Sequence, residues 1–123
     1  MAGIMHFAAF FRYMESAEHE MLRHWGYSIY DVVDGQTISF PRVATSCEYL
    51  SPARSEDELD ITVCVRRVGT KSVTYGFEFT CGQTEVARGE ITCVCCRIEH
   101  GEPPKSIAIP TELSEMLTSV LES

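Results

Sequence analysis

Long apolar segments and positive charge are both scarce in this sequence of 123 residues. No stretch approaches the roughly 18 apolar residues of a membrane-spanning helix, and the first residues carry neither the charged segment nor the cleavage pattern of a secretory signal. Lysine and arginine number 10 against 18 aspartates and glutamates, a net charge of −8. Such an acidic chain is not expected to present a broad binding face to nucleic acid or to an anionic membrane. We therefore expect a cytoplasmic protein without nucleic-acid or membrane partners.

Paired cysteine motifs are also scarce, which argues against a zinc site. The segment from Cys93 to Cys96 contains one C-x-x-C spacing, but the other cysteines of the 6 are isolated and supply no second ligand pair. The segment is strand-like, so Cys93 and Cys95 are expected on the face opposite Val94 and Cys96. We interpret the cysteines as reduced residues that fill small spaces in the core.

Two further arrangements of catalytic or metal-binding residues are missing. The serines and the 4 histidines form no nucleophile, base and acid pattern that the sequence supports. The acidic run at Glu56, Asp57, Glu58 and Asp60 lies in a strand-like segment. Because alternate side chains of a strand point to opposite faces, these carboxylates do not converge on one ion. We expect no metal site, and a solvated strand edge is the favoured interpretation.

The segment from Phe7 to Trp25 has the apolar periodicity of an amphipathic helix. Apolar residues recur at helical spacing with charged residues between them. The length predicts about five turns at 3.6 residues per turn. Gly26 follows where a left-handed C-terminal cap would lie, and Arg23 and His24 suit the negative end of the helix dipole.

Beyond this helix the apolar period changes to 2, which predicts long antiparallel strands. The alternating segments are 38–49 with a bulge or edge position at Pro41, 59–66, 73–81, and 86–98 with Gly89 as a bulge or a point of close approach. A short apolar segment at 107–109 follows, and Thr111 is expected to cap a closing helix.

One long helix followed by successive strands predicts an α+β fold in which an antiparallel sheet wraps around the helix. No linker or internal repeat is visible, so residues 1–123 are expected to form a single domain. Long strands around a single helix leave one sheet edge exposed, and pairing that edge across a two-fold axis is a simple way to cover it. We expect a homodimer, or a homotetramer built from two dimers.

Several segments carry a family resemblance in their order and spacing. They are Gly3–Phe7 with Phe10–Glu15, Tyr49–Ala53 with Asp57–Leu59, and Ala87–Gly89. Together they resemble the hotdog-fold acyl-CoA thioesterases related to 4-hydroxybenzoyl-CoA thioesterase, over nearly the whole chain. The resemblance implies a hotdog fold, whose first strand is absent from this sequence. It also implies hydrolysis of an acyl-CoA thioester without a metal or other cofactor.

The resemblance implies a catalytic site at the start of the long helix. The backbone amide of Phe7 is the expected oxyanion donor, and Gly3 lets the chain turn tightly toward the substrate. In relatives a carboxylate three residues before the glycine activates water or attacks directly, and that position would precede Met1. His6 is the alternative general base. The alternative for His6 is a structural role, in which its side chain packs beside the helix start or hydrogen-bonds a backbone carbonyl there.

Two helix residues are candidates for the acyl pocket by the same resemblance. Glu15 matches a position that faces the pocket in some relatives, where an acid recognises a polar acyl group. An ion pair with Arg12, or with an arginine across the sheet, is the alternative for Glu15. Ala9 and Phe10 stand where many relatives have Asn and Tyr, which makes the pocket of this chain more apolar. Phe10 remains a candidate for substrate binding.

A site for the phosphates of CoA should contain positively charged side chains, although the surface of this protein is otherwise acidic. The turn at 69–72 matches one that contacts the nucleotide phosphates in relatives, so Lys71 and the neighbouring Ser72 are the candidates. Arg67 and Arg88 are weaker ones. A merely solvated lysine is the alternative for Lys71.

The function expected from these observations is an acyl-CoA thioesterase with an oxyanion site at a helix N-terminus. A non-catalytic hotdog protein that binds acyl-CoA or an acyl-carrier partner, or that serves only as an oligomeric scaffold, is the alternative from another class. A hotdog dehydratase is a third interpretation, and the acid and histidine pair it needs is not evident in the sequence.

We expect the natural protein to begin with a further strand that ends in an acidic residue before Met1. Without that residue the chain should still bind acyl-CoA, but the rate of hydrolysis should be lower by a factor of about 10² or more. The test compares hydrolysis by this chain with that of a chain extended by roughly fifteen to twenty upstream residues, enough for one strand. Full activity of the present chain that vanishes in His6→Ala would instead establish His6 as the base.

Overall fold

The computed structural model describes residues 7–27, 30–33, 35–51 and 58–121. The predicted long helix is confirmed as α1, Phe7–His24, which is about five turns long. Gly26 takes a left-handed conformation with φ of 85°, and the Tyr27 amide donates to the Leu22 carbonyl at 2.8 Å. This is the glycine cap that the sequence predicts.

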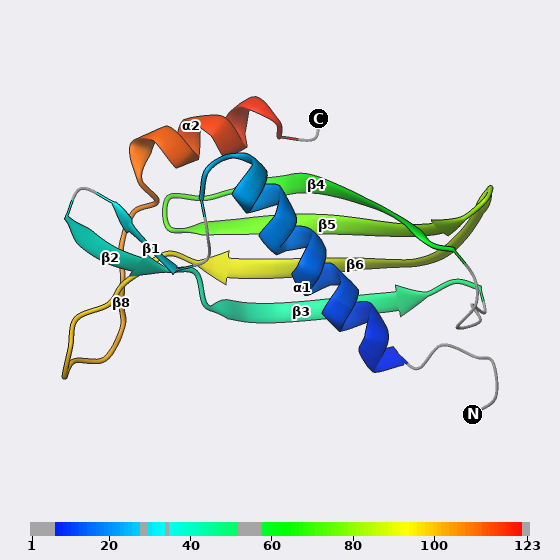
Figure 1. The fold of residues 1–123 in the computed structure, drawn as a ribbon, viewed down its shortest axis with the longest axis horizontal. Helices are drawn as coiled ribbons and strands as arrows, with labels where there is room; N and C mark the ends of the chain where they lie inside the picture. Colours follow the sequence, from blue (N-terminus) through cyan, green and yellow to red (C-terminus); the bar gives the residue numbers. More distant parts are fainter. Residues whose placement is uncertain (1–6, 28–29, 34, 52–57, 122–123) are drawn as a thin grey trace.

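Two antiparallel sheets follow α1 (Figure 1). The strands are β1 Tyr30–Val33, β2 Gln36–Ser39, β3 Arg42–Tyr49, β4 Asp60–Val68, β5 Ser72–Cys81, β6 Thr84–Val94, β7 Cys96–Arg97 and β8 Lys105–Ser106. The larger sheet has the order β3-β6-β5-β4 and the smaller one β1-β2-β7-β8. Figure 1 shows α1 lying across one face of the larger sheet. The predicted α+β architecture, a sheet wrapped around one long helix, is therefore confirmed.

The two longest alternating segments are each divided into two strands. The chain leaves β2 before Pro41 and enters β3 at Arg42, and the register then shifts between Arg42 and Ala44, as the parity change predicts. The other break lies at Cys95, between β6 and β7. Because this break ends the alternation, Cys96 is buried like Cys93 and Cys95. The predicted alternation therefore does not continue to Cys96, which belongs to β7 of the smaller sheet.

The C-terminal helix α2, Thr111–Ser119, starts differently from the prediction. Thr111 is the first helical residue, and Pro110 takes the N-cap position with φ of −51° and no side-chain hydrogen bond to the helix. The proline ring fixes this φ, so the chain enters the helix without a threonine cap. The expected capping role of Thr111 is therefore wrong. Leu113 and Leu117 of α2 are buried in the core.

Helix α1 runs antiparallel to β3, and three residues spaced four apart mark its path. Phe10 packs edge-on against Tyr49, and Met14 lies over Gly89, where an added Cβ would come within 2.6 Å of the Met14 Cε. Glu18 then reaches Arg42 at the other end of β3. The close approach predicted at Gly89 is confirmed, since an added Cβ would also come within 2.9 Å of the Ser46 carbonyl oxygen, a backbone atom that cannot move aside as the Met14 methyl can.

The Glu18 side chain is fully buried and makes two contacts with the sheet. One carboxylate oxygen pairs with the Arg42 guanidinium, and the other accepts a hydrogen bond from the Cys93 thiol at 3.1 Å. Arg42 also lies 3.6 Å from Glu15 and 3.1 Å from the Nε2 atom of His19. A buried carboxylate is tolerated only when it is paired and hydrogen-bonded. Arg42 therefore holds α1 to the strand at the sheet edge.

Removing one partner of this pair should destabilise the fold strongly. Arg42→Ala leaves the Glu18 carboxylate buried without its cation, and we expect the free energy of unfolding to fall by about 3–5 kcal/mol. In the double variant Arg42→Ala with Glu18→Gln, part of the loss should be recovered because no charge is left buried. The measurement is chemical denaturation.

The matched control is Arg97→Ala, which breaks a half-exposed pair with Glu99 at 3.1 Å. It should cost about 1 kcal/mol or less. An Arg42→Ala effect no larger than that of Arg97→Ala would show that the Glu18 contact contributes little.

Candidate functional site

The start of α1 lies over the Tyr49 end of the edge strand β3. The Phe10 ring meets the rings of Tyr49 and Phe79 edge-on, with centroids 5.2 and 5.1 Å away. Phe10 is 2% exposed, whereas Tyr49 is 46% and the neighbouring Leu50 39% exposed. Phe10, a predicted substrate-binding residue, therefore sits in the core, and Tyr49 and Leu50 form the accessible apolar surface at this end.

Phe7 is the first residue of α1, so its amide belongs to the group that has no acceptor within the helix. The first turn of α1 holds no acidic side chain. The positive end of the helix dipole therefore meets no carboxylate from this turn, and an anion would be stabilised there. Gly3 and His6, the other two predicted residues at the helix start, lie outside the described residues.

Glu15 lies in the middle of α1 on the side toward β3. Its carboxylate is 3.6 Å from the Arg42 guanidinium and its side chain is 54% exposed. An ion pair with an arginine across the sheet, one of the alternatives for this residue, is therefore present.

Lys71 and Ser72 lie at the opposite end of the sheet from the helix start. Lys71 is exposed and its carbonyl accepts from the Cys95 amide at 2.7 Å. Ser72 begins β5, seven positions before Phe79, which contacts Phe10. At about 3.3 Å per residue this separates Ser72 from the helix start by about 23 Å. Within one protomer, the predicted oxyanion donor Phe7 and the predicted phosphate contact Lys71 are therefore far apart.

Burial makes three thiols poor nucleophiles. It raises the pKa of Cys95 to about 11 and is the main cause of the raised pKa of the Cys47 thiol. The pKa of the Cys93 thiol is also raised, first by burial and then by the Glu18 carboxylate beside it. A thiol acts as a nucleophile only as its thiolate. These three cysteines are therefore protonated at neutral pH and do not provide a covalent mechanism.

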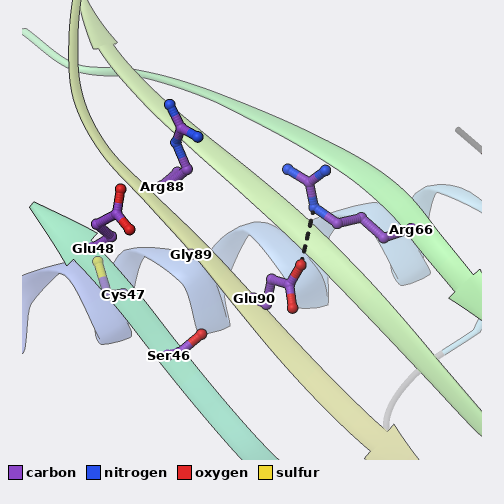
Figure 2. A pocket seen from close by; sticks show the side chains of 7 residues that line it. All are labelled: Ser46, Cys47, Glu48, Arg66, Arg88, Gly89 and Glu90. Atoms are coloured by element: carbon purple, nitrogen blue, oxygen red, sulfur yellow. Dashed lines mark ion pairs between the residues drawn. The ribbon is translucent and has the colours of Figure 1, made fainter. Parts of the chain in front are cut away.

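A polar groove of about 620 Å³ occupies the sheet face opposite α1 (Figure 2). Ser46 and Glu48 from β3, Arg88 and Glu90 from β6, and Arg66 from β4 line it. Figure 2 shows α1 behind the strands and the Arg66 side chain directed at Glu90, 3.4 Å away. Two arginines and two glutamates balance each other in charge, so the groove does not have the excess positive charge that a phosphate group would need.

Both weaker phosphate candidates are engaged on this outer face. The register shift between Val65 and Arg67 lets Arg67 approach Glu90, at 3.5 Å. Arg88 pairs with Glu85. The sequence alone does not reveal this groove, because Arg66, Glu48 and Glu90 come from three strands that are distant along the chain. Arg66 and Arg67 are adjacent arginines in a strand, and this was the one signal that could have pointed to a bulge.

Two further observations concern the described residues as a whole. No helix among them is long and apolar enough to cross a membrane. Within the same residues no three metal-binding side chains gather around a common point. The start of α1, with its free backbone amides, lies beside the exposed end of β3.

Comparison with known proteins identifies the family. The profile of the thioesterase-like superfamily matches residues 1–117. The chain belongs to this superfamily. It is 25% identical over 115 residues to a provisionally named esterase of Aquifex aeolicus strain VF5, a match that covers 94% of this chain and 85% of the relative. The resemblance to hotdog-fold thioesterases is therefore confirmed.

Solved structures share the fold of this chain. A Pseudomonas aeruginosa protein superposes with a TM-score of 0.79 at 25% identity, over 98% of this chain and 82% of its own. The 1,4-dihydroxy-2-naphthoyl-CoA thioesterase of Synechocystis gives 0.81 at 17% identity, over 96% and 85% of the two chains. The latter likeness concerns the fold alone. The predicted hotdog fold is confirmed.

Proposed function

We propose that this thioesterase-like protein hydrolyses acyl-CoA thioesters at the start of α1. The observation that supports this most is the position of Phe7, the first residue of a long helix whose first turn has no acidic side chain. Amides at such a helix start stabilise the oxyanion that forms when a thioester carbonyl is attacked. The exposed Tyr49 and Leu50 beside it provide apolar surface for the substrate.

The proposed reaction is addition of water followed by loss of the thiol. A general base takes a proton from water, whose oxygen bonds to the thioester carbon while the carbonyl becomes an oxyanion near the Phe7 amide. The oxyanion then reforms the carbonyl and the carbon–sulfur bond breaks. The CoA thiolate leaves and takes up the proton. His6 is the candidate base in this chain, and Gly3 allows the tight approach of the backbone to the substrate.

A dimer through β3 would complete the site. β3 is an edge strand of the larger sheet. It is 8 residues long, and among the described residues no other strand pairs with its outer side. Val43 is 61% exposed in this strand. An edge of this length that carries neither proline nor lysine favours pairing with another strand. Two-fold symmetry would pair β3 with the β3 of a second copy in antiparallel orientation.

The same symmetry would bring the two ends of the substrate site together. The turn at 69–72 lies at the Arg42 end of β3, because Ser72 pairs with Val94 and Arg42 pairs with Cys93. Antiparallel pairing reverses the second copy, so its own turn at 69–72 lies toward the helix start of the first. The acyl thioester would then bind one protomer while Lys71 of the other contacts the CoA phosphates.

Lys71→Ala should raise KM for acyl-CoA about fivefold, since an exposed charge contact contributes about 1 kcal/mol. The value of kcat should stay nearly unchanged, because a contact far from the thioester acts equally in the ground and transition states. Steady-state kinetics at low ionic strength measures both. Lys105→Ala, which removes an exposed lysine from β8, is the control. Equal effects of the two substitutions would remove Lys71 from the proposed site.

The β3 dimer predicts a mass near twice 13.8 kDa by light scattering at micromolar concentration. Thr45 lies near the middle of β3, so a two-fold axis places its two copies close together. Thr45→Lys should therefore set like charges against each other, shift the protein toward monomer and reduce hydrolysis. Thr62→Lys on β4, the other edge strand, is the matched control. A wild-type monomer would contradict the shared site.

A further inference from the structure

The outer side of β3 offers a regular set of backbone groups to a second strand. The Leu50 amide donates to the Val86 carbonyl at 2.9 Å. Because backbone groups alternate in direction along an antiparallel strand, the even-numbered residues of β3 direct theirs toward β6. Those of Thr45, Cys47 and Tyr49 therefore point away from the sheet. Among the described residues no strand pairs with that side, so a second copy of the strand can bond there.

The most exposed apolar side chains of β3 are arranged symmetrically. Val43 is 61% and Tyr49 is 46% exposed, and they lie three residues before and three residues after Ser46. The register shift between Arg42 and Ala44 places Val43 in a bulge, where it has no register partner on β6. If two copies pair antiparallel about Ser46, Val43 of each copy lies opposite Tyr49 of the other. A β-branched side chain opposite an aromatic one is a favourable cross-strand pair.

The two neighbouring registers use the strand less well. Residues directly opposite each other share a face of the sheet, so the two-fold axis passes beside a residue and not between two. An axis at Thr45 places Tyr49 opposite Pro41, which has no amide hydrogen to donate. An axis at Cys47 moves Val43 past the end of the partner strand. The register between these two covers both exposed side chains.

This register brings the second copy beneath the helix start. Figure 1 shows α1 crossing the larger sheet at an angle, with its first turn beyond β3 at the Tyr49 end of the strand. A second β3 would run under this turn, and Val43 of that copy would be the residue opposite Tyr49. Phe7, the proposed oxyanion donor, is the first residue of the same turn.

We propose that two copies join through β3 in the register centred on Ser46, and that Val43 of each copy forms part of the substrate surface at the helix start of the other. The inference rests on the proposed function and its β3 dimer, to which it adds the register and the shared residue. The strand expected before Met1 does not conflict with this pairing, because the larger sheet has another edge at β4. Each site is then incomplete in a single copy.

Disulfide trapping tests the register. Because the backbone groups of Ser46 point toward β6, its two copies would form a non-hydrogen-bonded pair with Cα atoms about 4.5 Å apart, which suits a disulfide. The two copies of Ala44, exposed on the same face, would lie about 13 Å apart along the strand. With oxidised glutathione, Ser46→Cys should give at least about tenfold more covalent dimer than Ala44→Cys. Both variants carry Cys47→Ser.

Four outcomes would overturn the register. Equal trapping of the two variants would place the axis at Thr45, and stronger trapping of Ala44→Cys would place it nearer Ala44. Trapping of the wild-type protein that is lost in Cys47→Ser alone would place it at Cys47. No covalent dimer in either variant would mean that the two β3 strands do not meet.

Val43→Asp tests the shared residue, and it is measured in the covalent Ser46→Cys dimer so that dissociation has no effect. The new carboxylate would lie near the oxyanion of the other copy, and it should lower kcat/KM for acyl-CoA by about tenfold or more. Val43→Asn has a similar shape without the charge and should recover most of this loss. Val120→Asp adds the same charge at another exposed valine, outside β3, and should change hydrolysis by less than about twofold. Equal effects of the two aspartate substitutions would remove Val43 from the site.

Mixed covalent dimers show on which copy Val43 acts. Phe7→Pro removes the proposed oxyanion donor at a helix position that tolerates proline. A dimer with Val43→Asp in one copy and Phe7→Pro in the other should keep one intact site and about half the activity. A dimer with both substitutions in the same copy should keep no intact site. The reverse result would mean that Val43 acts on its own copy, and it would overturn the proposal.

Trapping separates this inference from the proposed function. A covalent Ser46→Cys dimer that hydrolyses no acyl-CoA, or whose hydrolysis is unaffected by Phe7→Pro, would keep the strand register and reject the catalytic proposal together with the role of Val43 in it. Hydrolysis that depends on Phe7 while trapping fails would keep the catalytic proposal and reject the register.

Discussion

The buried contact between Glu18 and Arg42 determines how α1 lies on the sheet. A carboxylate can occupy the core only where a cation reaches it, so this contact fixes both the rotation and the position of the helix. With Glu18 in place, Met14 falls on Gly89, and Phe10 falls between Tyr49 and Phe79. The helix start is then held at the accessible end of the edge strand.

The distribution of charge explains why Lys71 remains the strongest cation candidate. Most arginines of the described chain are paired with glutamates, namely Arg42, Arg66, Arg67, Arg88 and Arg97. In contrast, neither Lys71 nor Lys105 forms an ion pair with another described residue. On a protein with a net charge of −8, a phosphate must be attracted locally, and a paired arginine would first have to leave its glutamate.

Local patterns in the sequence predicted the elements, while features that depend on distant contacts were missed. The period of α1, the cap at Gly26 and the change of parity near Pro41 are all local signals, and each was confirmed. Strand β1 was not predicted, because its four residues show too little alternation to be recognised. The break at Cys95 was also missed, since its amide bonds to the distant Lys71 carbonyl instead of a neighbour in one continuous strand.

The candidate site shows the same difference between features that local patterns predict and features that depend on distant contacts. The sequence located the helix start at Phe7, and the resemblance named the residues around it. Neither could show that Phe10 is enclosed by two other rings, or that Lys71 lies at the far end of the sheet. The polar groove is formed by residues from separate strands, so its existence depends on the tertiary fold.

The enclosed thiols have a practical consequence for following the motions of this protein. Cys93, Cys95 and Cys96 are shielded from solvent, whereas Cys47, Cys64 and Cys81 are only half-shielded. An alkylating reagent will therefore reach Cys64 and Cys81 in the native state, but it will reach Cys93 only when the helix lifts from the sheet. Because the Cys93 thiol donates to Glu18, its labelling rate reports how often that central contact opens. The chain thus carries its own chemical probe of local unfolding.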